Sequence, residues 1–153
     1  MRVVLQRVHR AAVTVDGRVT GAIDHGLVAL VGVGRTSTDE DARWLAAKAE
    51  GLRIFPDDGG RMNRSVVDAG GGVLAISQFT LYGDATRGRR PSFVAAADPA
   101  EGDRLYRLFC DSLTVPVGRG VFGAHMDIDM VCDGPVTITL EREGAGQPGM
   151  AGS

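Results

Sequence analysis

Three arginines crowd one short segment and give it the chemistry of a phosphate-binding loop. Arg87, Arg89 and Arg90 lie within four residues, in a stretch that also holds a glycine and is followed by a proline. The forked guanidinium group of arginine can donate two parallel hydrogen bonds to a phosphate. Contacts of this kind position a protein on a nucleic acid without reading its sequence. We therefore take these arginines as candidate nucleic-acid contacts, with an ordinary solvated loop as the alternative.

Hydrogen-bonding side chains also gather at the end of one apolar run. Ser77, Gln78 and Thr80 flank Phe79 directly after the apolar residues 73–76. A buried strand seldom ends in such groups unless they have partners. Residues 77–80 are therefore a candidate site, with a polar strand end before the turn at 82–84 as the alternative.

A second polar segment, residues 133–137, contains the pair Gly134-Pro135. Proline has no amide hydrogen, which suits it to a turn or to the rim of a sheet. The carbonyl groups of Gly134 and Pro135 are then free to accept hydrogen bonds from another group. Taken alone, this segment is typical of a turn.

Two further patterns do not support a cofactor or a metal site. Residues 118–123 match G-x-G-x-x-G, but the residues that follow alternate like a strand, and no strand-helix-strand unit surrounds the glycines. His9, His25 and His125 are too scattered for the spacing of a zinc site. We expect neither a metal nor a cofactor.

The elements that must position these segments follow from hydrophobic spacing. Alternating residues predict strands early in the chain, at 2–8, 11–15, 19–23 and 27–33, with a tight turn at Asp16-Gly17. A capping box over 37–40 predicts a helix from about residue 38 to residue 52, and Asp98-Pro99 begins a second helix.

Later strands are expected at 73–79, 126–132 and 136–140, the last two joined by residues 133–135. The order of strands, helix, strand, helix and strands predicts an α+β fold with a largely antiparallel sheet or barrel and two helices. We expect one domain over residues 1–143 and a disordered, glycine-rich tail over residues 144–153.

Length and charge narrow the function classes. A chain of 153 residues fits one domain, and its net charge of -2 creates no overall field that would attract a polyanion, so any nucleic-acid contact must be a local patch. Two isolated cysteines argue against a disulfide framework and favour a reducing cytoplasm. The sequence shows no signal-peptide pattern and no apolar stretch of about 18 residues, so we expect a protein that is neither secreted nor membrane-spanning.

Together, the segments SQFTL at 77–81 and GPVT at 134–137 resemble the D-aminoacyl-tRNA deacylases. The likeness extends from Met1 to about Glu141, because further segments follow in the same order as in that family. These are Gln6-Arg7-Val8, Val13-Thr14-Val15-Asp16-Gly17, Arg53-Ile54-Phe55, Met62-Asn63, Arg90-Pro91-Ser92-Phe93 and Phe122-Gly123-Ala124 with Met126.

This resemblance implies a homodimeric esterase that removes D-amino acids from the 3′ end of tRNA, and glycine from mischarged tRNA(Ala). In that family Gly-Pro is a cis dipeptide that enters the active site of the partner subunit. Carried over, the carbonyls of Gly134 and Pro135 bind the α-ammonium group of the substrate and leave no room for an L side chain. A buried ammonium group must be paired, and two fixed carbonyls can pair it only when the side chain on the α-carbon points outward. Chirality is then read by exclusion of the L side chain. Arg7 would anchor this loop by hydrogen bonds to its backbone.

Ester hydrolysis also needs donors aimed at the developing oxyanion, for which the backbone amides of Gln78, Phe79 and Thr80 are the candidates. Thr80 is either a nucleophile or a positioning group. No His or Asp neighbour is evident in the sequence to activate it, so we expect a positioning group, with water attacking and the ribose 2′-hydroxyl assisting. The chain departs from the family at Cys132, where asparagine is usual and where a thiol offers only weak hydrogen bonds.

Two other functions fit parts of the sequence. One is a non-catalytic tRNA- or ribosome-associated binding module that uses Arg87, Arg89 and Arg90. The acidic balance of the chain weighs against it, because binding through phosphate contacts usually needs a more basic protein. The other is an esterase for free D-amino acid esters, which a requirement for tRNA would separate from the deacylase.

Overall fold

The computed structural model describes residues 1–144. Its strands are β1 (Arg2–Val15), β2 (Arg18–Ile23), β3 (Gly26–Gly32), β4 (Phe55–Pro56), β5 (Met62–Arg64), β6 (Gly72–Ser77), β7 (Val117–Arg119) and β8 (Asp127–Glu141). The helices are α1 (Asp39–Gly51), α2 (Pro99–Ser112) and one turn of 3-10 helix, η1 (Phe79–Tyr82). The tail expected at residues 144–153 lies outside the described residues apart from Gly144.

The main sheet is built around β1, which forms one bent strand of 14 residues where two strands were expected. Its first half pairs with β3 and its second half with β2, while β8 runs along its other edge. The register with β8 shifts on both sides of Val8, and such bulges bend a strand. Val3 and Leu5 therefore pack in one hydrophobic cluster, and Val8 and Val13 in another.

The sheet is largely antiparallel, as expected, but β6 and β7 add parallel pairs to it, so it is mixed. β1 is antiparallel to β2, β3 and β8, whereas β3, β6 and β7 run parallel to one another. Parallel neighbours need a long crossover connection. α1 lies in the first crossover, from β3 to β6, and α2 in the second, from β6 to β7. The Thr20 hydroxyl in β2 donates to the carbonyl of Arg119 in β7 at 3.2 Å, so the sheet curls into a nearly closed barrel.

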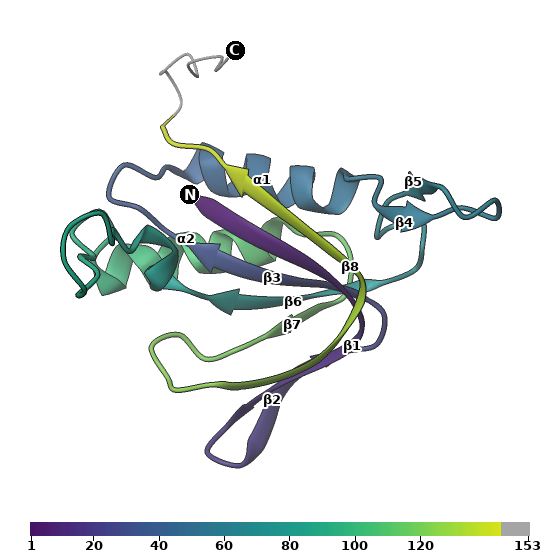
Figure 1. The fold of residues 1–153 in the computed structure, drawn as a ribbon, viewed down its shortest axis with the longest axis horizontal. Helices are drawn as coiled ribbons and strands as arrows, with labels where there is room; N and C mark the ends of the chain where they lie inside the picture. Colours follow the sequence, from purple (N-terminus) through teal and green to yellow (C-terminus); the bar gives the residue numbers. More distant parts are fainter. Residues whose placement is uncertain (145–153) are drawn as a thin grey trace.

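Both helices cover the same side of the sheet (Figure 1). Their apolar residues share one cluster with β1, β3 and β6. Asp98 caps α2 as expected, with its carboxylate accepting from the amide of Glu101 at 3.0 Å. The capping box of α1 is shifted by one residue from the expected position, because Thr38 is the cap and Asp41 its partner. No helix within residues 1–144 is long and apolar enough to cross a membrane.

Candidate active site

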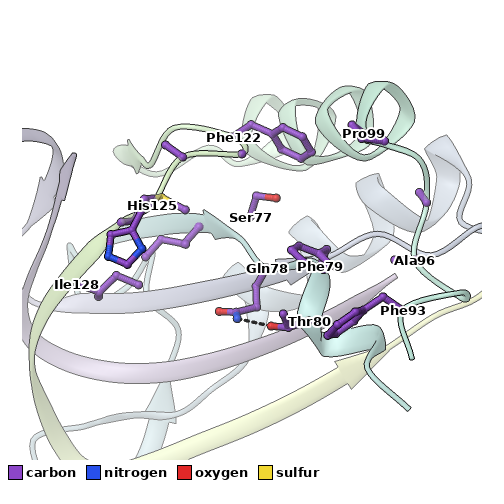
Figure 2. A pocket seen from close by; sticks show the side chains of 15 residues that line it. Ser77, Gln78, Phe79, Thr80, Phe93, Ala96, Pro99, Phe122, His125 and Ile128 are labelled. Atoms are coloured by element: carbon purple, nitrogen blue, oxygen red, sulfur yellow. Dashed lines mark hydrogen bonds between the residues drawn. The ribbon is translucent and has the colours of Figure 1, made fainter. Parts of the chain in front are cut away.

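A cavity of about 550 Å³ lies where β6 gives way to η1 (Figure 2). Four segments form its walls: the end of β6 with η1, residues 93–99 before α2, the 122–126 loop, and the start of β8. All four residues of the candidate segment 77–80 line it. The remaining lining residues are Ile76, Phe93, Ala96, Ala97, Pro99, Phe122, Gly123, Ala124, His125, Met126 and Ile128.

The backbone at this site differs from the strand that was expected to reach residue 79. β6 ends at Ser77, and residues 79–82 turn into η1. The amide of Gln78 donates to the carbonyl of Val31 at 2.8 Å, so it is already occupied. The amides of Phe79 and Thr80 have no hydrogen-bond partner among the described residues, as is usual in the first turn of a helix. Of the three amides proposed as oxyanion donors, two are therefore available.

The side chain of Thr80 points toward Gln78, whose amide group donates a hydrogen bond to the threonine hydroxyl (Figure 2). Within residues 1–144, no histidine or carboxylate forms a hydrogen bond with this hydroxyl. A serine or threonine nucleophile needs an adjacent base to remove its proton. Among the described residues, therefore, no hydrogen-bonded base is present to activate Thr80 as a nucleophile.

Contacts from both ends of the chain hold η1 in place. Arg2 in β1 donates to the carbonyl of Leu81 at 2.9 Å and lies over the ring of Tyr82. The hydroxyl of Tyr82 donates to the carboxylate of Glu143, just beyond β8. Burial raises the pKa of Tyr82 above its ordinary value, and the hydrogen bond to Glu143 raises it further. Tyr82 thus remains a neutral donor that ties η1 to the end of β8.

The cavity is aromatic and carries no acidic side chain. The rings of Phe79 and Phe93 meet edge to face with their centres 5.1 Å apart, and the ring of Phe122 faces Tyr106 behind it at 6.5 Å. None of the lining residues is an aspartate or a glutamate. Within one chain, therefore, no side chain of opposite charge in the lining can pair with a cationic group of a ligand.

Gly134 and Pro135 do not line this cavity. Both are exposed on β8, which is one continuous strand where a turn between two strands was expected. The peptide bond between them is cis. Gln6 pairs with Thr137 and Val8 with Cys132, so residues 133–136 form a bulge opposite Arg7.

Arg7 fixes the start of this bulge. It is a largely buried side chain that donates to the carbonyl of Ile54 at 2.6 Å and to the carbonyl of Asp133 at 3.3 Å. Its guanidinium also lies 3.2 Å from the Asp133 carboxylate. Arg7 therefore donates to the backbone of the residue before Gly134, where the family resemblance implied hydrogen bonds to the backbone of the Gly134-Pro135 loop.

Gln6 fixes the other end of the bulge. Its side-chain amide donates to the carbonyl of Val136 at 3.2 Å and accepts from the hydroxyl of Thr137 at 2.6 Å. The thiol of Cys132 is exposed and makes no hydrogen bond among the described residues. The side chains of Arg7 and Gln6 on β1 therefore hold the bulge, and position 132 contributes only through its backbone pairing with Val8.

The arginine loop is exposed and lies outside the cavity. Arg87, Arg89 and Arg90 form no ion pair within the described residues and sit between Asp84 and Ser92, whose backbones pair. The carboxylate of Asp84 accepts from both the amide and the hydroxyl of Thr86, at 2.9 and 2.7 Å. These contacts shape the loop and leave its guanidinium groups free for solvent or a ligand.

Several residues of the cavity were missed by reasoning from sequence. Phe93, Phe122 and Met126 belong to segments that carry the family resemblance, but nothing in their spacing gave them a role. His125 was considered only as a metal ligand, and it instead lies at the edge of the cavity across from Ala96 and Pro99 (Figure 2).

Comparisons with known protein sequences identify deacylases that act on D-aminoacyl-tRNA as relatives of this chain. A family model described as D-Tyr-tRNA(Tyr) deacylase matches residues 4–141. A D-aminoacyl-tRNA deacylase of Deinococcus radiodurans is 59% identical over 144 residues, covering 92% of this chain and 99% of the relative. One from Halalkalibacterium halodurans is 54% identical over 146 residues, covering 94% of this chain and all of the relative.

Two solved structures share the fold. One, described as c-Myc DNA Unwinding Element Binding Protein, has a TM-score of 0.88 and 35% identity, covering 94% of this chain and 100% of that chain. A probable eukaryotic D-amino acid tRNA deacylase has a TM-score of 0.75, covering 91% and 97% of the two chains, and at 20% identity it supports the fold alone.

Proposed function

The chain belongs to the D-Tyr-tRNA(Tyr) deacylase family, and from this we propose that it hydrolyses the ester bond of D-aminoacyl-tRNA, releasing the D-amino acid and tRNA. It is a hydrolase whose substrate partner is aminoacyl-tRNA. Such an enzyme acts where charged tRNA is used, so we place it in the cytoplasm.

The observation that carries the mechanism is the pair of unpartnered amides, those of Phe79 and Thr80, in the wall of an aromatic cavity. The terminal adenosine enters the cavity with its ester carbonyl beside these amides. Water attacks the carbonyl carbon, and the two amides stabilise the negative charge that develops on the oxygen. Electrons then return to the carbonyl, the bond to the ribose oxygen breaks, and that oxygen takes up the proton that the attacking water has lost. Gln78 and Thr80 orient the ribose hydroxyl that assists the attack.

Chirality is read by Gly134 and Pro135 of a second copy of the chain. The α-ammonium group of the substrate needs acceptors, because a buried charge without a partner is costly. The lining contains no carboxylate, and the exposed bulge at 133–136 lies outside the cavity of its own chain. Both facts support a homodimer in which the Gly134 and Pro135 carbonyls enter the partner's cavity. There they accept from the ammonium group and exclude an L side chain.

Two consequences follow from exclusion. Glycine has no side chain to exclude, so glycyl-tRNA(Ala) is also a substrate. D-amino acids with different side chains are accepted, because nothing contacts the side chain itself. Arg87, Arg89 and Arg90 bind backbone phosphates of the tRNA, as forked donors suited to that task.

The first test is hydrolysis of matched D-tyrosyl- and L-tyrosyl-tRNA by the purified protein, without added metal. We expect rapid release from the D ester only. A Gly134→Ala/Pro135→Ala variant that remains folded by circular dichroism should lose this discrimination. Binding of tRNA without hydrolysis of either ester would favour the binding module, and equal hydrolysis of free D-tyrosine esters would favour the small-molecule esterase.

A second experiment tests the shared site. Light scattering should give the mass of a dimer. Heterodimers can combine a Gly134→Ala/Pro135→Ala subunit with a Phe79→Pro subunit, which lacks one of the two oxyanion amides. They should recover discrimination against L-tyrosyl-tRNA at their one intact site, with about half of the wild-type activity on the D ester. A monomer with full activity, or heterodimers without recovery, would contradict the cross-subunit arrangement.

A further inference from the structure

A second hollow adjoins the candidate active site. It measures about 500 Å³ and is lined by Arg35, Ala96, Ala97, Asp98 and Glu101. Ala96 and Ala97 line the first cavity as well, so the two hollows share a wall. In Figure 2 this wall is marked by Ala96 and Pro99, on the side of the cavity away from His125 and Ile128. A ligand that fills the first cavity can therefore continue over this wall into the second.

The shared wall is firmly fixed to the sheet. The amide of Ala97 donates to the carbonyl of Val33 at 3.0 Å, and the amide of Arg35 donates to the carbonyl of Ala95 at 3.0 Å. Gly34 and Ala96 pair as an isolated antiparallel bridge. Arg35 is consequently held on the same rigid piece as the wall of the cavity.

The polar groups of the second hollow combine one free donor with one free acceptor. The guanidinium of Arg35 forms no ion pair or hydrogen bond within the described residues, and one oxygen of Asp98 is likewise free while the other caps α2. The Glu101 carboxylate is engaged by Arg104, at 2.6 and 3.0 Å, and Arg104 also binds Asp39 at 2.7 Å. Two carboxylates beside one free arginine disfavour a phosphate. A neutral group with both donor and acceptor edges fits.

We propose that this hollow receives the base of the penultimate nucleotide of the RNA substrate, a cytosine. The inference rests on the proposed function, since tRNA ends in the sequence CCA. Arg35 donates to the O2 and N3 acceptors of the base, and the free oxygen of Asp98 accepts from its exocyclic amino group. Aspartate and arginine are the residue types that make such contacts to base edges. Uracil places an oxygen where cytosine has the amino group, so it faces the Asp98 carboxylate with a second acceptor.

The test compares three minimal esters of D-tyrosine: those of adenosine, of cytidylyl-adenosine and of uridylyl-adenosine, each carried on the 3′-terminal ribose. The adenosine ester lacks the penultimate nucleotide and reports on the first cavity alone. We expect kcat/KM for the cytidylyl-adenosine ester to exceed that for the adenosine ester by about tenfold or more, which is the range of one specific base contact. The uridylyl-adenosine ester should gain much less.

Variants assign the effect to the hollow. Arg35→Ala should remove the advantage of the cytidylyl-adenosine ester, whereas Arg18→Ala should keep it, because Arg18 is an exposed arginine on β2 that also lacks an ion pair in the described chain. Asp98→Asn still caps α2, since asparagine is an equally good cap. It should selectively reduce the preference for cytosine over uracil.

Each result decides the question. Equal kcat/KM for the adenosine and cytidylyl-adenosine esters would overturn the proposal. So would equal gains with cytosine and uracil, or an advantage that survives Arg35→Ala. Hydrolysis of the adenosine ester in those cases would leave the proposed function standing. No hydrolysis of any ester or of D-tyrosyl-tRNA would overturn the proposed function and this inference with it.

Discussion

Arg7 in β1 binds Asp133 in β8 through both the backbone carbonyl and the carboxylate of the aspartate. The same guanidinium donates to the carbonyl of Ile54, so one side chain joins three segments that are distant in sequence. Asp133 begins the bulge that presents Gly134 and Pro135 on the surface. The orientation of Gly134 and Pro135 therefore depends in part on the contacts of Arg7 with Asp133.

Arg7→Ala should lower both stability and stereoselectivity. It leaves buried acceptors without a donor, which costs roughly 1–3 kcal/mol of unfolding free energy. Urea denaturation measures this loss, and hydrolysis of L-tyrosyl-tRNA should rise relative to the D ester. Arg18→Ala serves as the control for removing an arginine. A variant with wild-type selectivity would show that the bulge does not need this anchor.

Thr80→Ala should retain substantial hydrolysis of D-tyrosyl-tRNA, because the backbone amides remain and water is the attacking group. We expect kcat to fall by about tenfold to a hundredfold. This loss is no larger than the loss that usually follows removal of one oxyanion donor. Rates under single-turnover conditions measure the effect on chemistry. Complete loss of activity in a folded variant would instead favour Thr80 as the nucleophile.

Tyr82→Phe should destabilise the protein and reduce kcat with little change in KM. The variant removes only the hydroxyl that ties η1 to Glu143, and one such hydrogen bond contributes about 1 kcal/mol. In a double-mutant cycle with Glu143→Gln, the two effects on unfolding free energy should be coupled. Additive effects would mean that the two side chains act independently.

Lowering the pH should reduce the order of the arginine loop, because the Asp84 carboxylate that accepts from Thr86 becomes protonated. The amide and then the hydroxyl of Thr86 hold the pKa of Asp84 below its ordinary value. Its contribution to loop order is thus complete above the pKa of the unfolded chain and disappears as the pH falls through the lower pKa of the folded state. A carboxyl-carbon NMR titration should show this lowered midpoint, and Asp84→Asn should raise KM for tRNA. A midpoint at or above that of an unstructured peptide would contradict it.

Replacing Arg87, Arg89 and Arg90 by alanine should raise KM for D-tyrosyl-tRNA and leave kcat nearly unchanged. The logarithm of the association constant should depend less steeply on salt, by about one unit of slope for each phosphate that the variant no longer neutralises. Hydrolysis of the D-tyrosyl ester of adenosine, which lacks the tRNA body, is the internal control. An unchanged salt dependence would place the tRNA contacts elsewhere.

Local signals in the sequence were enough to place most elements and to select the candidate segment 77–80. The spacing of Ala42, Leu45 and Ala49 predicted α1 to within a residue at either end, and Asp98 was correctly assigned as the cap of α2. Residues 77–80 were selected because polar groups rarely end a buried strand, and all four line the cavity. Each of these patterns is decided by neighbours within a few residues.

Features that depend on residues distant in sequence were decided only by the tertiary structure. The two predicted strands at 2–8 and 11–15 are one strand, because β8 pairs with β1 across bulges whose position no local pattern records. The amide of Gln78 is occupied only because Val31 lies beside it in the neighbouring strand. The second hollow, likewise, exists because the chain at residues 34–35 pairs with the chain at residues 95–96. Contacts over such separations depend on the packing of the whole sheet, whereas periodicity and capping depend on adjacent turns of the chain.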